Sequence, residues 1–269
     1  MLALVRNIAR LLRGGAAVPS AIMHDSPITY ATDGLITSHT LPFDRDDAFK
    51  EALAHVRSQV SHPCYHVYRL SMAVWCVQSA VSFDNFSSDD IFVELGVGEG
   101  ITSLLVHKYM SLKGKPLQTS FFLADTFRGI DTRLVSAAEV QSWGESAEQH
   151  RDNLLASSYK HSSLLAVQKR FEPYENVRFL EGSCPDILHA TEESIRNVRF
   201  AHIDMNNAFP EAESLKFLLT RLKSPAIVLF DDYAFANCRH QRDAIDAVCL
   251  AAGIACPTPL PTGQGLLFR

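Results

Sequence analysis

Three aspartates follow two hydrophobic runs of the sequence and offer the oxygen ligands that a divalent cation prefers. Asp204 ends the run FAHID, and Asp231 and Asp232 end the run AIVLFDD. No lysine or arginine is adjacent to them in sequence, and like charges at close range are costly unless something compensates them. Mg²⁺ would compensate them, because it binds carboxylate oxygens and keeps several waters. The pattern predicts a magnesium site; the alternative is that the aspartates cap a helix and close a turn.

A glycine-rich turn forms a second candidate site, for a nucleotide-like ligand. The run VELGVGEG places Gly96, Gly98 and Gly100 between a β-branched and aromatic run and a helix-like stretch. A strand that ends in such a turn and continues as a helix is typical of a βαβ nucleotide site. The dinucleotide fingerprint G-x-G-x-x-G would place its third glycine at Ile101, however. The spacing therefore argues against a nicotinamide or flavin enzyme.

These candidate residues meet only if the chain forms a parallel sheet. Strand-like and helix-like segments alternate from residue 91 onward, which predicts such a sheet with helices on both faces. Ligands then bind beyond the carboxyl ends of the strands. We expect a doubly wound α/β fold with a mostly parallel, seven-stranded Rossmann-like sheet and a terminal antiparallel hairpin. Strands are expected at residues 91–95, 120–124, 177–180, 198–203 and 226–230, and in the hairpin at 254–256 and 266–268.

The chain before the first strand predicts a helical extension, residues 1–85, in front of a main domain, residues 86–269. Helices are expected at residues 48–60 and 65–81, and the second has hydrophobic residues at the i, i+4, i+7 and i+11 spacing of a buried face. Residues 27–42 are expected to form a loop.

A long connection follows the second strand. Residues 131–172 exceed what a compact parallel fold needs, and extra segments of this kind are often lids over a site. We therefore expect a lid-like helical insertion. The alternative is an additional helical layer that takes no part in binding.

The first fifteen residues, MLALVRNIARLLRGG, combine hydrophobic residues at helical spacing with three arginines. The hydrophobic run is too short and too often interrupted to span a bilayer. Three interpretations stay open: peripheral contact with an anionic membrane surface, an organelle transit peptide, or a helix packed on the protein or on a second subunit.

Composition narrows the class of protein. The 269 residues are 47% hydrophobic and 20% charged, which is typical of a soluble globular protein. The formal net charge of -5 argues against a nucleic-acid partner. The six cysteines form no C-x-x-C pair, so we expect reduced thiols and a cytoplasmic location.

Several motifs together resemble one enzyme family. Glu94 precedes the turn and gives E-x-G-x-G-x-G, which resembles the first motif of the S-adenosylmethionine-dependent methyltransferases with a Rossmann-like fold. The segments HID and FDDY are similar to those of the macrocin and mycinamicin type of sugar O-methyltransferase, as are YRLSMAVWCVQSAV, DTFRGI and LPTGQGLLFR. The resemblance covers about residues 68–269, and it implies that the main domain is a methyltransferase domain.

The resemblance implies S-adenosylmethionine as cofactor and Mg²⁺ that chelates neighbouring hydroxyls of a sugar or glycan acceptor. It also implies a homo-oligomer. Asp125 ends the second strand, where an acidic residue can accept hydrogen bonds from ribose hydroxyls, although it also fits a turn or an N-cap. The cofactor residues are then Glu94, Gly96, Gly98, Gly100, Asp125, Gly182 and Ser183, and the metal ligands are Asp204, Asp231 and Asp232.

One position departs from the family. Several of these enzymes carry an aspartate as general base two positions after the metal aspartate, where this chain has Asn206. Besides Asp204 and Asn206, the catalytic candidates include His202, with Asp186 and His150 as further proton acceptors, and the base stays unassigned. His202 also fits a core histidine. Two other functions stay open: methylation of a small phenolic or polyketide acceptor, and a non-catalytic cofactor-binding interaction module.

Overall fold

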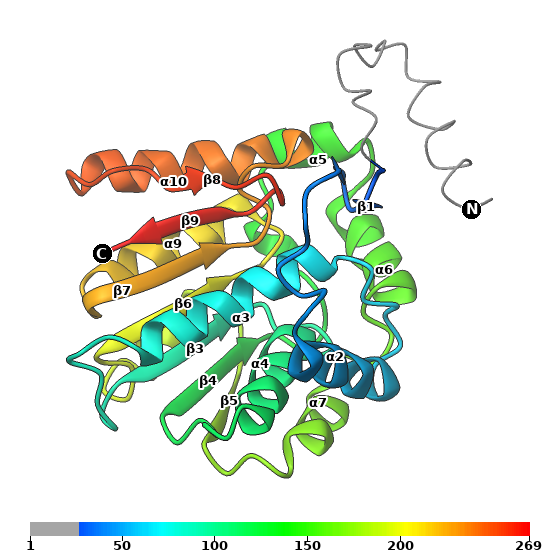
Figure 1. The fold of residues 1–269 in the computed structure, drawn as a ribbon. Coiled ribbons are helices and arrows are strands. Elements are labelled where there is room, and N and C mark those ends of the chain that lie inside the picture. Colours follow the sequence, from blue (N-terminus) through cyan, green and yellow to red (C-terminus); the bar gives the residue numbers. More distant parts are fainter. Residues whose placement is uncertain (1–26) are drawn as a thin grey trace.

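A seven-stranded sheet organises the chain in the computed structural model, which describes residues 27–269 (Figure 1). Its five parallel strands coincide with the strand-like segments of the sequence, and the residues of β3 are all buried. The strands are β3 (Ile91–Leu95), β4 (Ser120–Asp125), β5 (Val177–Glu181), β6 (Val198–Ile203), β7 (Leu222–Phe230), β8 (Thr258–Pro259) and β9 (Gly265–Phe268).

The strand order is β5-β4-β3-β6-β7-β9-β8, as expected for a doubly wound fold. The pairs from β5 to β7 are parallel, whereas β9 runs antiparallel to β7 and β8. The chain moves outward from β3 to β5 and then returns to β6 on the other side. This reversal between β3 and β6 is the topological switch point at which ligands bind in such sheets.

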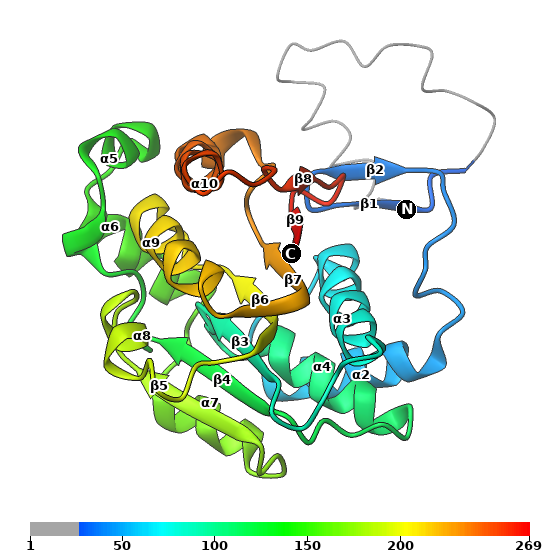
Figure 2. The same ribbon diagram turned by 90° about the vertical axis from the view of Figure 1, so that its left-hand side faces the viewer.

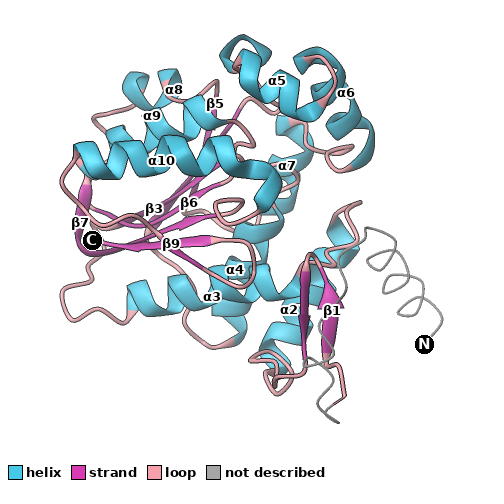
Figure 3. Cartoon of the chain, turned by 90° about the horizontal axis from the view of Figure 1, so that it is seen from above, coloured by secondary structure: helices cyan, strands magenta, loops and turns pink. Residues whose placement is uncertain are grey.

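Helices cover both faces of the sheet, as Figures 2 and 3 show. Alternate residues of β3 point into the two layers: Phe92 belongs to one core, and Ile91, Val93 and Leu95 belong to the other. One layer contains α2 (Asp47–Gln59), α3 (Val67–Val81), α4 (Ile101–Leu112) and α7 (Leu164–Phe171), and the other contains α8 (Asp186–Ala190), α9 (Ala208–Leu219) and α10 (Arg239–Ala251).

The two helices expected before the first strand are present as α2 and α3. Both bury their hydrophobic side chains in the same core as β3, so they complete one layer of the sheet. The basic helix predicted at residues 1–15 lies outside the described residues. None of the helices between residues 27 and 269 has the length and hydrophobicity that crossing a membrane requires.

Two local expectations are wrong. Residues 27–42 contain a hairpin rather than only a loop, formed by β1 (Tyr30–Thr32) and β2 (Leu35–Thr37) around the turn Asp33-Gly34. The Asp-Gly pair is itself a hairpin signal, because both residues adopt positive φ here. The strand expected at residues 254–256 lies instead at β8, since the amide of Ile254 bonds back to the carbonyl of Cys249 at the end of α10.

The long connection between β4 and β5 contains the helices α5 (Ala137–Trp143) and α6 (Ala147–Ser157) before α7. Glu139 ties α5 to the start of α9, because its carboxylate accepts a hydrogen bond from the amide of Ala208 at 2.8 Å. After α6 the chain passes over the carboxyl ends of the strands, where Tyr159 lies against the glycine turn.

Candidate active site

The three glycines of the turn make room for neighbouring parts of the protein. A Cβ on Gly96, whose φ is +85°, would lie 1.7 Å from the carbonyl oxygen of Asp204. A Cβ on Gly98 would lie 3.0 Å from the ring of Tyr159, and one on Gly100 would lie 2.7 Å from the ring of Phe171. The turn therefore packs directly against the end of β6, the segment after α6 and α7.

A first cavity opens beside this turn and contains five of the seven expected cofactor residues: Gly96, Gly98, Asp125, Gly182 and Ser183. Gly100 is outside the lining and caps α4. Glu94 is also outside it, buried behind the turn, where its carboxylate bonds to Ser103 and to His202.

Asp125 fastens the glycine turn to the end of β4. One carboxylate oxygen accepts hydrogen bonds from the amides of Val97 and Gly98 at 2.6 and 2.9 Å, and the other accepts one from Phe127 at 2.7 Å. Burial raises the pKa of the Asp125 carboxyl, although these amides favour its charged form. The carboxylate thus shapes the cavity from the protein side.

The ends of β6 and β7 bring the predicted carboxylates together. Oxygens of Asp204 and Asp231 lie with a ring nitrogen of His202 in one cluster whose ligand atoms are all within 4.8 Å of one another. Asp231 lies against β6, since its amide donates to the carbonyl of Ile203 at 3.0 Å. These donors could hold a metal ion, whereas Asp232 lies outside this cluster.

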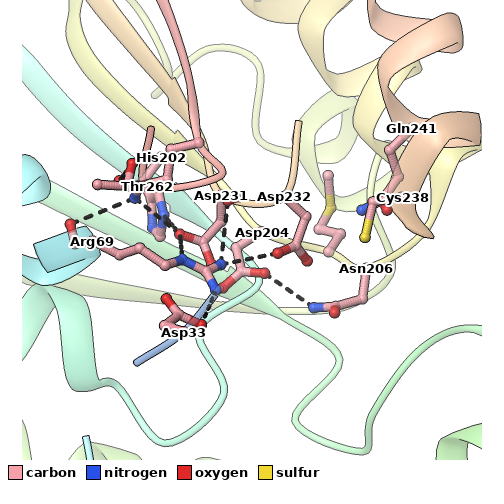
Figure 4. Close-up of polar contacts among 12 residues, drawn as sticks. Asp33, Arg69, His202, Asp204, Asn206, Asp231, Asp232, Cys238, Gln241 and Thr262 are labelled. Carbon is pink, nitrogen blue, oxygen red and sulfur yellow. Dashed lines mark hydrogen bonds and ion pairs between the residues drawn. The ribbon is translucent and has the colours of Figure 1, made fainter. Parts of the chain in front are cut away.

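Arg69 of α3 compensates the charges that appear unpaired in the sequence (Figure 4). Its Nε donates to Asp231 at 3.3 Å, and Nη2 donates to Asp231 and, at 2.9 Å, to Asp232. Nη1 lies 3.6 Å from Asp33 in the β1–β2 turn. The aspartates have no lysine or arginine adjacent in sequence, but they have one in space, because a residue 162 positions earlier folds against them.

The neighbouring charges and burial shift the pKa values of the three aspartates in different directions. Burial alone would raise the pKa of Asp231, but Arg69 and His202 hold it well below its usual range. Burial and the charge of Asp231 instead raise the pKa of Asp204, and they raise that of Asp232 to about 6. Asp231 therefore stays ionised to a lower pH than the other two aspartates.

His202 is buried between two carboxylates. Its Nδ1 lies 3.1 Å from Glu94, and its Nε2 lies 3.6 Å from Asp231. Burial alone would lower the pKa of His202, but the two carboxylates raise it to about 10. The imidazole is thus protonated near neutral pH. In that form it neither ligates a metal nor accepts a proton, so the two aspartates are the stronger ligands of the cluster.

Asn206 positions its neighbour and accepts no proton. Its side-chain amide donates to the carboxylate of Asp204 at 3.0 Å and lies 3.4 Å from the hydroxyl of Tyr159. The other proposed proton acceptors lie elsewhere: His150 stacks on Trp143, and neither it nor Asp186 lines a cavity beside the carboxylates.

A second cavity lies on the other side of the aspartates. It shares three lining residues with the first cavity, namely Tyr159, Asp204 and Asn206. Burial lowers the pKa of His66 in its wall to about 4, so this ring is neutral. The sequence did not indicate this wall, which comes from the loop before α3 and the β1–β2 turn. Its other lining residues include Asp33, His62, Tyr65, His66, Arg69, Asp231, Asp232 and Gln264.

Comparisons with known proteins agree with this architecture. The family described as a methyltransferase domain matches residues 93–233. The solved structure of the O-methyltransferase NovP is similar with 19% identity and a TM-score of 0.59, covering 83% of this chain and 97% of that one.

The calicheamicin methyltransferase CalS11 is similar with 16% identity and a TM-score of 0.54, covering 86% and 94%. A ligand-free structure of CalS11, described as a TDP-rhamnose 3'-O-methyltransferase, has a TM-score of 0.45 with 15% identity, covering 86% and 96%. No curated protein matches the chain.

Proposed function

The chain belongs to the family of methyltransferase domains, and from this premise we propose that it methylates a hydroxyl oxygen of a sugar or glycosylated small molecule. The observation that carries the proposal is that Asp204, Asn206 and Tyr159 line both cavities. A methyl donor in one cavity and an alcohol in the other would be in contact only at this boundary. The description of CalS11 as a sugar methyltransferase supports the acceptor class.

The first cavity would hold S-adenosylmethionine. The glycine turn, Asp125 and the Gly182-Ser183 turn would contact it, in the order in which they follow three neighbouring strands. The bound cofactor supplies a methyl group already activated on a sulfonium, so the protein mainly has to align the acceptor oxygen. Tyr159 would close the cavity against water from the lid side.

The aspartates would hold Mg²⁺ on the acceptor side. Asp204 and Asp231 fit this role, because their oxygens already lie within reach of one ion and are the ligand type that Mg²⁺ prefers. Asp232 would join them if Arg69 releases its carboxylate. A bound divalent ion lowers the pKa of a coordinated hydroxyl. Asn206 would keep Asp204 oriented.

The test is mass spectrometry of acceptors after incubation with S-adenosylmethionine and Mg²⁺, using sugar nucleotides, glycosylated metabolites and simple phenols. We expect methylation of a sugar hydroxyl that is lost with EDTA. Asp231→Asn should lose the activity but keep cofactor affinity within about threefold, since Asp231 does not line the first cavity. Asp243→Asn, at an exposed carboxylate of α10, is the matched control.

Each alternative has its own outcome in this assay. Methylation of phenols alone would favour a phenolic or polyketide acceptor. Cofactor binding without methylation of any acceptor would favour an interaction module. Full activity in EDTA, or in Asp231→Asn, would remove the metal from the proposal.

A further inference from the structure

Arg69 is bonded to the carboxylates that the proposed magnesium site needs. Its side chain is only 13% exposed and comes from α3, a different layer of the protein from the strand ends that carry the aspartates. The guanidinium bridges Asp231 and Asp232, as Figure 4 shows. A cation of one positive charge is therefore built into the cluster.

The surroundings hold the guanidinium in this place. Its carbon lies 5.0 Å from the centroid of the Phe235 ring, a cation–π contact that suits the planar group. The Nη1 atom lies 3.6 Å from Asp33, which provides a third carboxylate partner outside the proposed metal ligands. Gln264 donates to Asp231 at 3.0 Å beside it. Arg69 thus contacts Asp231, Asp232 and Phe235, and it has Asp33 as a further carboxylate partner that is not a proposed metal ligand.

We infer that Arg69 is a resident counter-cation that competes with a divalent metal for Asp231 and Asp232 and so sets the metal affinity of the site. The inference rests on the proposed function. A guanidinium and a divalent ion repel each other, and a carboxylate oxygen bonded to Nη2 has less electron density to offer a metal. Metal binding therefore requires Arg69 to give up part of its bonding, and Asp33 is the carboxylate that can retain it.

This makes Arg69 a positioning residue. Its guanidinium orients the carboxylates of Asp231 and Asp232 and reduces the repulsion between them. It would not itself contact the acceptor oxygen that reacts. Arg69 would then offset part of the negative charge that attracts the metal, and metal would be retained chiefly when the acceptor adds its own oxygen ligands. Weak metal binding to the free protein is the measurable consequence.

Titration calorimetry with Mn²⁺, without cofactor or acceptor, tests the inference. We expect Arg69→Met, which keeps the length and packing of the side chain, to bind Mn²⁺ at least tenfold more tightly than the wild type. Arg69→Lys should tighten binding by about threefold, because an ammonium keeps the charge but cannot bridge two carboxylates with a rigid fork. Arg239→Met, at an exposed arginine of α10, should leave the affinity unchanged.

Unchanged or weaker Mn²⁺ binding in Arg69→Met overturns the inference. If circular dichroism shows that this variant does not fold, Arg69→Lys decides by the same comparison. In the wild type itself, the Nε nuclear magnetic resonance signal of Arg69 must shift when Mg²⁺ is added. A signal that stays in place also overturns the inference, whichever variants fold.

The outcome separates this inference from the proposed function. Equal Mn²⁺ affinity in the wild type and in Arg69→Met would refute competition between Arg69 and the metal, but it would leave the proposal of metal-assisted methylation standing. Absence of Mn²⁺ binding in the wild type and in all the variants would refute both the competition and the magnesium site. Methyl transfer is measured separately with and without EDTA, so the transferase proposal is judged on its own result.

Discussion

Gly96→Ala should destabilise the protein far more than the same substitution at a glycine that also has a positive φ but faces open space. The ideal Cβ would lie 1.7 Å from the carbonyl oxygen of Asp204 and 2.5 Å from its carbonyl carbon. These are backbone atoms, so no side-chain rotation relieves the overlap. The end of β6 would have to move away from β3 by roughly 1.5 Å to restore van der Waals separation.

The magnitude has two parts. The left-handed φ of +85° costs an alanine roughly 1 kcal/mol, and displacement of a packed strand end adds roughly 3 kcal/mol. Gly114→Ala is the matched control, because its φ is +70° and its Cβ would meet nothing within 4 Å. Only the first part applies there, so the two variants should differ by about 3 kcal/mol.

Urea unfolding followed by circular dichroism measures this difference, and calorimetry with S-adenosylmethionine measures the effect on the cavity. Gly98→Ala should lose an intermediate amount of stability, because its Cβ would lie 3.0 Å from the ring of Tyr159 and a side chain can move more easily than a backbone carbonyl. If Gly96→Ala and Gly114→Ala lost equal stability, the close packing of the turn against β6 would be refuted.

Substitutions at three further residues test a buried carboxyl group, a buried ion pair and the residue shared by the two cavities. Burial raises the pKa of Glu211 to about 8, so the stability of the wild type should fall as pH rises from about 4.5 to 8, by at most about 1.4 kcal/mol per pH unit. Glu211→Gln should not show this loss. A difference in melting temperature between the two proteins that does not change with pH would contradict the prediction. Asp90→Asn should cost about 3 kcal/mol in urea unfolding, because it leaves the fully buried Arg199 without its charged partner at 2.7 Å. The guanidinium also donates to three backbone carbonyls, so a loss below about 1 kcal/mol would show that these carbonyls are enough to stabilise it. Tyr159→Ala should lower kcat/KM at least tenfold by opening the boundary between the cavities, whereas Tyr159→Phe should stay within about twofold; equal losses would assign the role to the hydroxyl.

The sequence was sufficient for the five parallel strands of the sheet and for the list of polar strand ends. The strands at residues 91–95 and 198–203 have the predicted bounds, because runs of hydrophobic residues bounded by turn residues determine local structure. Parallel strands align their carboxyl ends, so the approach of Asp204 to Asp231 followed from topology alone. The hairpin around Asp33 was missed, although its Asp-Gly turn is a local hairpin signal.

Only the tertiary structure decided how the charges are compensated and what the glycines contact. Arg69 meets Asp231 from another layer of the fold, and His202 lies between Glu94 and Asp231, so neither pairing leaves a local sequence pattern. The neighbours of Gly96 are likewise set by packing. Secondary structure follows from residues a few positions apart, whereas electrostatic energy depends on distance in space, which the chain fixes only after it has folded.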